Sequence, residues 1–245
     1  MPNGNPGSKA VVEAVGKGAP LRWVENKVLA RHLHGLGIEI GALWRKFRVP
    51  SGASVWYVDR YDSDALAGEY PEVGAKIVPP DVAADATSLP FRDASLDFII
   101  ASHLLEHLPF PLRGLRHWYA LLRSGGTLLL KVPDKRFTFD QRRERTTLQH
   151  LVAEDAEPEN FDRRAHFRDW IKNSVEQTLS TKDLERETDR LMTTDYSIHY
   201  HVWTSRDVRD LAEYTQTAMN LSWRPVQFFG GCFYRKECSL VLRKD

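Results

Sequence analysis

Several histidines stand where they could take a proton from a hydroxyl group. Four of them lie in or just after one highly charged segment, residues 135–190: His150, His166, His199 and His201. An imidazole with its ordinary pKa near 6.5 suits general-base chemistry at neutral pH. If the segment is extended, His199, His201 and Trp203 share one face, and the aromatic side chains nearby suit a sugar-binding surface. A single histidine is usually structural, so it is their number that favours a functional site.

Acidic side chains lie in or directly after two short apolar runs early in the chain. Glu39 belongs to the run that ends on Gly41, and Asp59 directly follows the run 54–58. At the carboxyl end of a strand, a glycine lets a ligand approach the backbone, and a carboxylate can accept hydrogen bonds from both hydroxyls of a ribose. The simpler alternative is that Gly41 turns the chain and Asp59 starts a turn. The two residues together favour a nucleotide-like ligand.

The elements that must position these residues follow from the alternation of apolar runs and turn signals. Such alternation is typical of a mostly parallel sheet that is covered on both faces. Strands are expected over residues 37–42, 54–58, 76–78, 96–101 and 127–132. Helical spacing predicts helices over 21–34 and 104–122, the second ending in a C-cap at Ser124-Gly125-Gly126. After the charged segment we expect a helix over 205–219 and strands over 225–229 and 238–243.

More specific motifs lie between these runs. Asp85-Ala86 precedes a Leu89-Pro90-Phe91 turn, Leu96-Asp97-Phe98 opens a strand, and Leu105-Glu106-His107 follows it. Together with the acids of the first two strands, this combination resembles the class I S-adenosylmethionine-dependent methyltransferases over about residues 36–133. The resemblance implies a doubly wound, Rossmann-like α/β fold with about seven mostly parallel strands, an antiparallel last strand and a helical insertion. It also implies an enzyme that uses S-adenosylmethionine.

The resemblance further implies which residues hold this cofactor. The methionine part would lie against Glu39, Gly41 and Ala42, the ribose against Asp59 and Arg60, the adenine against Asp85 and Ala86, and the sulfonium above Ser102 and His103. These residue types fit, because carboxylates accept hydrogen bonds from hydroxyls and amines and offset the charge of a sulfonium. The family's glycine-rich continuation is replaced by Leu43-Trp44-Arg45-Lys46-Phe47, so the first loop must take another path.

The acceptor is expected to be a hydroxyl of a sugar or of a polysaccharide precursor. Segments around Asp134, His150, His166 and His201 resemble a methyltransferase subgroup that acts in glycan and polysaccharide assembly. Asp134 follows the last parallel run and is expected to orient the base or to bind the acceptor. The candidates for the base itself are His103, His166, His199 and His201.

Metal dependence is a separate question. Some members of that subgroup depend on magnesium, which makes Mg²⁺ a candidate second cofactor. Asp134, Asp140, Asp155 and Asp162 offer hard oxygen ligands, but their spacing specifies no site. Cys232 and Cys238 form no Cys-x-x-Cys pair, so neither a thiolate zinc site nor a disulfide scaffold is expected.

Three other functions compete with this one. A phenolic or other small-molecule hydroxyl would use the same cofactor half, but an apolar acceptor pocket would then be expected. The spacing Gly35-x-Gly37-x-x-x-Gly41 suggests a nicotinamide dinucleotide, but two of these glycines precede or start the strand. An inactive scaffold would be expected to lack the cofactor carboxylates, which are present.

Length and composition set the frame for these expectations. A chain of 245 residues with 42% hydrophobic and 27% charged residues is expected to form one domain over 19–245, preceded by a mobile arm at 1–18. Residues 135–200 would form a helical lid over the acceptor. A formal charge of +1 gives no reason to expect nucleic acid, and no apolar run reaches the length of a membrane span. We therefore expect a cytoplasmic protein with a small-molecule or oligosaccharide acceptor.

Overall fold

A seven-stranded sheet forms the centre of the protein. The computed structural model describes residues 19–175 and 178–245, so the expected arm at 1–18 lies outside the described residues. The strands run in the order β3-β2-β1-β4-β5-β7-β6. Their bounds are β1 Gly35–Ile40, β2 Ala53–Asp59, β3 Val82–Ala83, β4 Leu96–Ser102, β5 Leu122–Pro133, β6 Trp223–Phe229 and β7 Glu237–Lys244. β7 is antiparallel to both of its neighbours, and β1 to β5 are parallel, which confirms the expected sheet.

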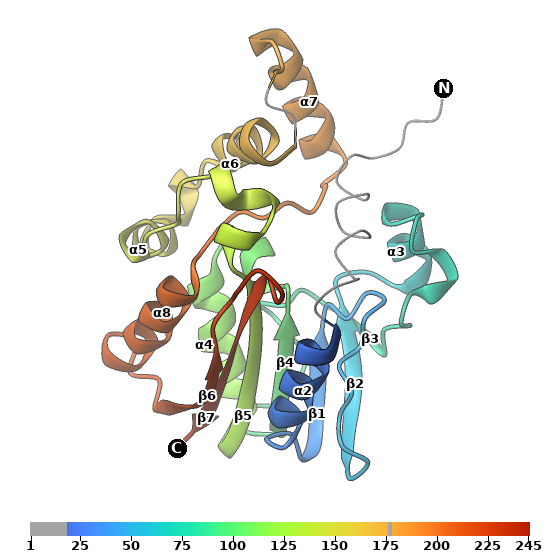
Figure 1. Cartoon of the computed structure of the whole chain (residues 1–245), viewed down its shortest axis with the longest axis vertical. Helices are drawn as coiled ribbons and strands as arrows, with labels where there is room; N and C mark the ends of the chain where they lie inside the picture. The colour runs from blue at the N-terminus through green and yellow to red at the C-terminus, as the bar shows by residue number, and fades with distance from the viewer. Residues whose placement is uncertain (1–18, 176–177) are drawn as a thin grey trace.

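Helices cover both faces of this sheet (Figure 1). Their bounds are α2 Ala19–Ala30, α3 Ser63–Glu69, α4 Pro111–Leu121, α5 Leu148–Ala156, α6 Arg163–Trp170, α7 Thr181–Thr193 and α8 Ser205–Thr217. In β4, Phe98 and Ile100 pack with Leu29 of α2, whereas Ile99 packs in the cluster that contains residues of α4 and α8. Alternate residues of this strand thus pack into two different cores, one on each face of the sheet. This is why its sequence is a continuous apolar run.

The prediction of a strand at residues 76–78 is wrong. Residues Gly74–Lys76 form a 3-10 turn, and β3 begins only at Val82. The backbone amide of Val78 donates to the carbonyl of Leu43 at 2.6 Å, which ties this segment to the first loop instead of the sheet. Two prolines follow Val78 directly, and neither can donate a hydrogen bond to a neighbouring strand.

The prediction of one continuous helix over 104–122 is also wrong. Leu105–His107 is a single 3-10 turn, and α4 starts at Pro111. Leu108 has extended backbone because it precedes Pro109, where the α conformation is disfavoured. α4 ends at Leu121, and Gly125, with φ of 78°, lies inside β5 and is not a C-cap.

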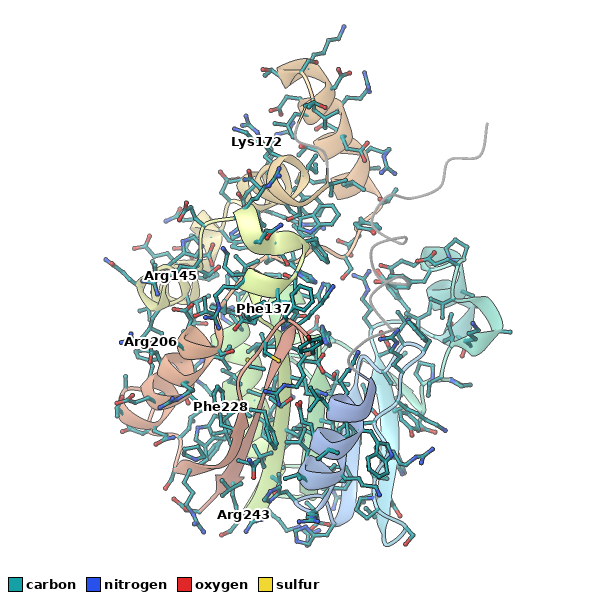
Figure 2. All side chains as sticks on the ribbon, viewed as in Figure 1. Phe137, Arg145, Lys172, Arg206, Phe228 and Arg243 are labelled. Carbon is teal, nitrogen blue, oxygen red and sulfur yellow. The ribbon has the colours of Figure 1, made fainter. Side chains whose placement is uncertain are left out.

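The helices between β5 and α8 form a separate layer. Figure 1 shows α5, α6 and α7 beyond the end of the sheet from which β5 leaves, and in Figure 2 Phe137 marks the start of this insertion. Phe167, Ile171, Leu191 and Ile198 form a core there that is distinct from the two cores of the sheet. The helical character expected for 135–200 is therefore confirmed, and its action as a lid stays a prediction. No helix in the described ranges is long and apolar enough to cross a membrane.

Candidate active site

The carboxyl ends of three neighbouring strands meet at Gly41. The register pairs Ile40 of β1 with Val58 of β2 on one side and with Ala101 of β4 on the other. Gly41 therefore lies between the next residues of those strands, Asp59 and Ser102. Its φ of 72° is in the left-handed region, and of the residues that the structure describes, a side chain added there would meet only Leu104, at 3.5 Å. This edge leaves room for a ligand to approach the backbone.

Asp59 and Arg60 stand at the end of β2. Burial raises the pKa of Asp59, although the backbone amide of Arg60 donates to its Oδ1 at 2.8 Å. The guanidinium of Arg60 pairs with Glu69 and lies 3.6 Å from Oδ2 of Asp195, in the insertion. Arg60 thus connects the ribose end of the expected cofactor site with the segment expected to cover the acceptor.

Asp85 and Ala86 follow β3 with contrasting environments. Asp85 is exposed, and its Oδ1 accepts a hydrogen bond from the backbone amide of Thr87 at 2.7 Å. Ala86 is buried, and its carbonyl accepts a hydrogen bond from Nε1 of Trp118 at 2.8 Å. A fixed carboxylate beside a small apolar residue fits the recognition of an adenine, so these residues suit S-adenosylmethionine.

Glu39 has a different environment from the one expected. Its carboxylate is buried, and both oxygens accept from the backbone amide of Phe47 at 2.9 Å. Burial raises the pKa of Glu39 to about 7. Glu39 therefore fastens the first loop, in which Leu43 adopts a φ of 45° and Phe47 is buried in the α2 core. This is the other path that a loop without the family's glycines takes.

His103 lies directly after β4 and is 45% exposed. Its Nε2 is 2.5 Å from Oε2 of Glu237, and the other carboxylate oxygen of Glu237 is 2.8 Å from Nζ of the buried Lys131. Burial alone would lower the pKa of His103, but the hydrogen bond and charge of Glu237 raise it. The imidazole of His103 is thus already engaged by a carboxylate through Nε2.

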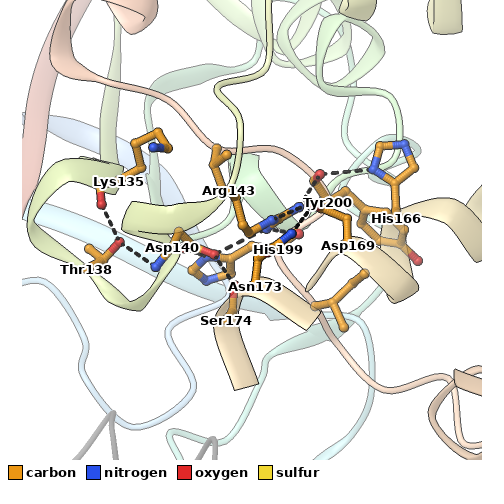
Figure 3. Close-up of polar contacts among 12 residues, drawn as sticks. Lys135, Thr138, Asp140, Arg143, His166, Asp169, Asn173, Ser174, His199 and Tyr200 are labelled. Atoms are coloured by element: carbon orange, nitrogen blue, oxygen red, sulfur yellow. Dashed lines mark hydrogen bonds and ion pairs between the residues drawn. The ribbon is translucent and has the colours of Figure 1, made fainter. Parts of the chain in front are cut away.

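His199 is held by a buried carboxylate (Figure 3). Its Nδ1 lies 2.7 Å from Oδ2 of Asp140, which belongs to the 3-10 turn Phe139–Arg142. The other oxygen of Asp140 accepts hydrogen bonds from Nη1 of Arg143 at 3.2 Å and from Oγ of Ser174 at 3.0 Å. Burial would raise the pKa of Asp140, but its interactions with the imidazole of His199 and the guanidinium of Arg143 lower it overall. The pair has the arrangement of a base and the carboxylate that orients it.

This pair lies beside the turn that follows β4. The rings of His199 and His107 are 4.7 Å apart, and the amide of Tyr200 donates to the carbonyl of Glu106 at 2.8 Å. The Glu106 carboxylate is buried, and neither of its oxygens accepts a hydrogen bond from the part of the chain that the structure describes. One ligand atom each of Glu106, His107 and His199 lie within 4.8 Å of one another, so this group could bind a cation or a polar acceptor.

The other histidines form a second cluster. His166 lies 2.7 Å from Glu154, measured from Nε2 to Oε1, and Nε2 of the fully buried His201 lies 3.1 Å from the carbonyl of Pro109. The expected sugar-binding aromatic surface is wrong, because Trp170 and Trp203 are buried in the cores. The exposed ring beside a candidate base is instead Phe139, which is 5.0 Å from the ring of His199.

Asp134 lies at the carboxyl end of β5, as expected, but it is fully buried. Its carboxylate accepts five hydrogen bonds, from Arg136 and from the backbone and hydroxyl of Ser205. This carboxylate holds the start of α8 in place. The remaining acids considered for magnesium are also engaged, since Asp155 pairs with Arg113 and Asp162 accepts from the amide of Ala165.

The part of the chain that forms the cofactor edge matches a known family. Residues 15–130 match the family model described as a methyltransferase domain. These residues make up slightly less than half of the chain, and the match is a similarity to that family. The match agrees with the resemblance seen in the sequence, and the strand order is that of a Rossmann-like fold. No curated protein has significant sequence similarity to the chain.

Two solved structures share the fold of this chain. A protein from Listeria monocytogenes, provisionally assigned as an S-adenosylmethionine-dependent methyltransferase, has 14% identity and a TM-score of 0.50, covering 93% of this chain and 99% of its own. A protein from Rhodobacter sphaeroides, provisionally assigned as a zinc-dependent alcohol dehydrogenase, has 18% identity and a TM-score of 0.54, covering 91% and 90%. At these identities both show the Rossmann-like fold alone.

The sequence alone does not reveal how the side chains at this edge are paired. It presents Asp140 only as a candidate metal ligand and gives no sign of Glu237. Glu106 and His107 were visible within the Leu-Glu-His motif, which was the available signal for the turn after β4. Asp140 had no such signal, because its partner His199 lies 59 residues away in the chain.

Proposed function

We propose that the protein is an S-adenosylmethionine-dependent O-methyltransferase that acts on a hydroxyl of a sugar or polysaccharide precursor. The observation that carries the proposal is the buried Asp140–His199 pair beside the turn that follows β4. In this class of fold, ligands bind at the carboxyl ends of the strands, and β4 lies next to the cofactor edge at Gly41. A base at this place can reach an acceptor that lies over the methyl group.

Methyl transfer to a hydroxyl is an in-line displacement. The residues must place the acceptor oxygen about 3 Å from the methyl carbon and must remove its proton. Bound S-adenosylmethionine supplies an electrophilic methyl group on a sulfonium. His199 takes the acceptor proton at Nε2, because Asp140 holds Nδ1 as a donor and so fixes the tautomer. As the oxygen–carbon bond forms, the ionised Asp140 stabilises the imidazolium and acts as a positioning residue.

The cofactor edge supports the first half of this reaction. In the proposal, Asp59 accepts hydrogen bonds from the ribose hydroxyls, and Asp85 accepts from the exocyclic amine of the adenine beside Ala86. Gly41 lets the cofactor lie close to the backbone, and Glu39 acts indirectly by holding the loop that follows it. His103 stays paired with the carboxylate of Glu237 near the sulfonium end.

The acceptor class is inferred from the surroundings of His199. Its neighbours are polar or charged, namely Asp140, Glu106 and His107, which suits the many hydroxyls of a sugar better than an apolar ring. Phe139 is 37% exposed next to His199 and offers a flat face for the C–H groups of a sugar ring. The sequence resemblance to the glycan subgroup points the same way, and within it to the 1-O-methyltransferase of methylmannose polysaccharide synthesis.

A phenolic acceptor is the second candidate, because the exposed Phe139 would also stack on an aromatic ring. A panel of mannose, mannosides, mannose oligosaccharides and catechol separates the two, with release of S-adenosylhomocysteine as the readout. Each acceptor is tested with Mg²⁺ and with a chelator. We expect turnover with a mannoside and its loss in His199→Ala, while the exposed His34→Ala serves as the matched control.

Two results would contradict the proposal in distinguishable ways. Turnover with catechol and with none of the sugars would overturn the acceptor class while leaving the methyltransferase activity in place. Failure of the parent protein to bind S-adenosylmethionine by isothermal titration would overturn the cofactor assignment itself.

A further inference from the structure

Three histidines and one glutamate from separate elements converge away from the Asp140–His199 pair. His150 and Glu154 lie one turn apart on α5, His166 lies on α6, and His201 lies on the extended segment that leads to α8. Oε1 of Glu154 is 2.9 Å from Nε2 of His150 and 2.7 Å from Nε2 of His166. One ligand atom from each of the three histidines lies within 4.8 Å of the others.

Backbone carbonyls orient two of these rings. The carbonyl of Tyr200 lies 3.1 Å from Nδ1 of His166, and the carbonyl of Pro109 lies 3.1 Å from Nε2 of His201 (Figure 3 shows the His166 contact). A carbonyl accepts only from a protonated nitrogen, so each ring keeps its lone pair on the other nitrogen. Histidines that bind metals are held in this way, with the second nitrogen donating to a carbonyl or carboxylate.

Two buried atoms of this cluster lack partners. Nδ1 of His201 and Oε2 of Glu154 make no hydrogen bond to any described residue. The His201 ring is fully buried, so bulk water does not replace the missing partner. In addition, Nε2 of His166 can donate to Glu154 only if the ring carries a second proton. A cation in the cluster would take the place of the second proton on His166. It would also bind the two atoms that lack a hydrogen bond.

We propose that His150, Glu154, His166 and His201 bind one Zn²⁺ ion. Three imidazole nitrogens and one carboxylate oxygen are a ligand set that suits zinc, whereas Mg²⁺ prefers oxygen ligands. Ligand atoms about 2.0–2.2 Å from a tetrahedral ion lie about 3.3–3.5 Å apart, so the cluster needs only small side-chain movements. His150 is 48% exposed and provides the path by which the ion enters.

The ion would fasten the insertion to the segment that carries the proposed base. His201 is two residues from His199, and the amide of His201 donates to the carbonyl of Glu106 at 3.2 Å. Zinc would therefore join α5 and α6 to this segment and hold His199 beside Asp140. Its role is structural, because four protein ligands complete a tetrahedral zinc and leave no position for a substrate.

The test uses the untagged full chain after treatment with a chelator. Zn²⁺ is titrated in competition with a chromophoric chelator, and the melting temperature is measured with and without the metal. Co²⁺ serves as a spectroscopic probe, since its visible absorption distinguishes tetrahedral from octahedral sites. The variants are His150→Ala and Glu154→Gln in the cluster, His107→Ala in the other histidine group, and His34→Ala as an unrelated control.

We expect one Zn²⁺ per chain, a tetrahedral Co²⁺ spectrum and a higher melting temperature with zinc. His150→Ala and Glu154→Gln should weaken binding by at least tenfold and abolish the thermal effect, while His107→Ala and His34→Ala should not. Because His150 is half exposed, its variant is expected to fold, and circular dichroism checks this. Absence of stoichiometric binding, or binding that His107→Ala abolishes and His150→Ala leaves unchanged, would overturn the proposal.

Discussion

Oδ2 of Asp140 lies 2.7 Å from Nδ1 of His199, and Asp140 is almost completely buried. The contact joins the second 3-10 turn after β5, Phe139–Arg142, to the extended segment before α8. Arg143 reinforces it, because its guanidinium also donates to the carbonyls of His199 at 2.7 Å and of Tyr200 at 3.1 Å. The buried hydrogen bonds of Asp140 and Arg143 therefore fix the position of His199, the proposed base.

Replacement of Asp140 tests whether this network orients the base. Asp140→Asn preserves the side-chain volume, but its amide can present a donor to Nδ1 and so favour the wrong tautomer of His199. We expect kcat to fall by roughly 10²-fold or more, with little change in the affinity for S-adenosylmethionine. Steady-state kinetics and isothermal titration give the two quantities, and Asp210→Asn on the exposed face of α8 is the control. An unchanged kcat would show that Asp140 does not position a catalytic residue.

Asp59 is expected to contribute to cofactor affinity. Hydrogen bonds to a charged group are worth about 1.5–3 kcal/mol, so Asp59→Ala should raise the Kd for S-adenosylmethionine by roughly 10-fold to 100-fold. Asp85→Ala should weaken binding as well, by a smaller factor because Asp85 is exposed. Isothermal titration with both S-adenosylmethionine and S-adenosylhomocysteine measures these changes. Equal affinity in the parent and Asp59→Ala would remove Asp59 from the site.

Glu39 should make folding stability depend on pH. Its pKa is raised from 4.5 to about 7 in the folded state, so between these values the folded protein binds more protons than the unfolded chain. The contribution of Glu39 to stability is therefore present below pH 4.5 and is lost as the pH rises to about 7. Glu39→Gln has no charge to bury, and relative to the parent it should gain up to roughly 3 kcal/mol between pH 5 and pH 8. Urea unfolding at both pH values measures the gain, and the exposed Glu213→Gln should show none.

Gly37 is expected to be required for the contact between β1 and β4. A Cβ atom at this position would lie 2.4 Å from the backbone carbonyl oxygen of Phe98 and equally close to its ring. Gly37→Ala should therefore destabilise the protein by more than about 2 kcal/mol, as strained core substitutions do. Gly52→Ala is the matched control, because no atom of the described residues lies within 4 Å of its added Cβ. Similar unfolding midpoints for the two variants would contradict the close approach of these strands.

The sequence was sufficient for the features that depend on local pattern. Apolar runs locate β1, β4 and β5 because these strands are largely buried on both faces, and acids directly after such runs must lie at the same edge of a parallel sheet. The run 54–58 also locates β2, although Val58 is the buried residue of that strand. Local pattern failed where prolines changed the backbone, at Val78 and at Leu108. It also could not pair side chains that are distant in the chain. The Asp140–His199 and Glu237–His103 contacts each join residues of different elements that are far apart in the chain. No periodic pattern in the sequence therefore predicts them.

The order of the strands places β3 and β6 at the two edges of the sheet. An edge strand offers unpaired backbone groups to any other extended chain, which is a common start of aggregation. Here β3 has only two residues, and β6 contains Pro225 with an irregularity between Pro225 and Gln227. A strand this short offers few free groups, and a proline with a bulge interrupts the regular ladder that an incoming strand needs. The β6 margin of the sheet thus resists strand addition by a second molecule, which favours correct folding.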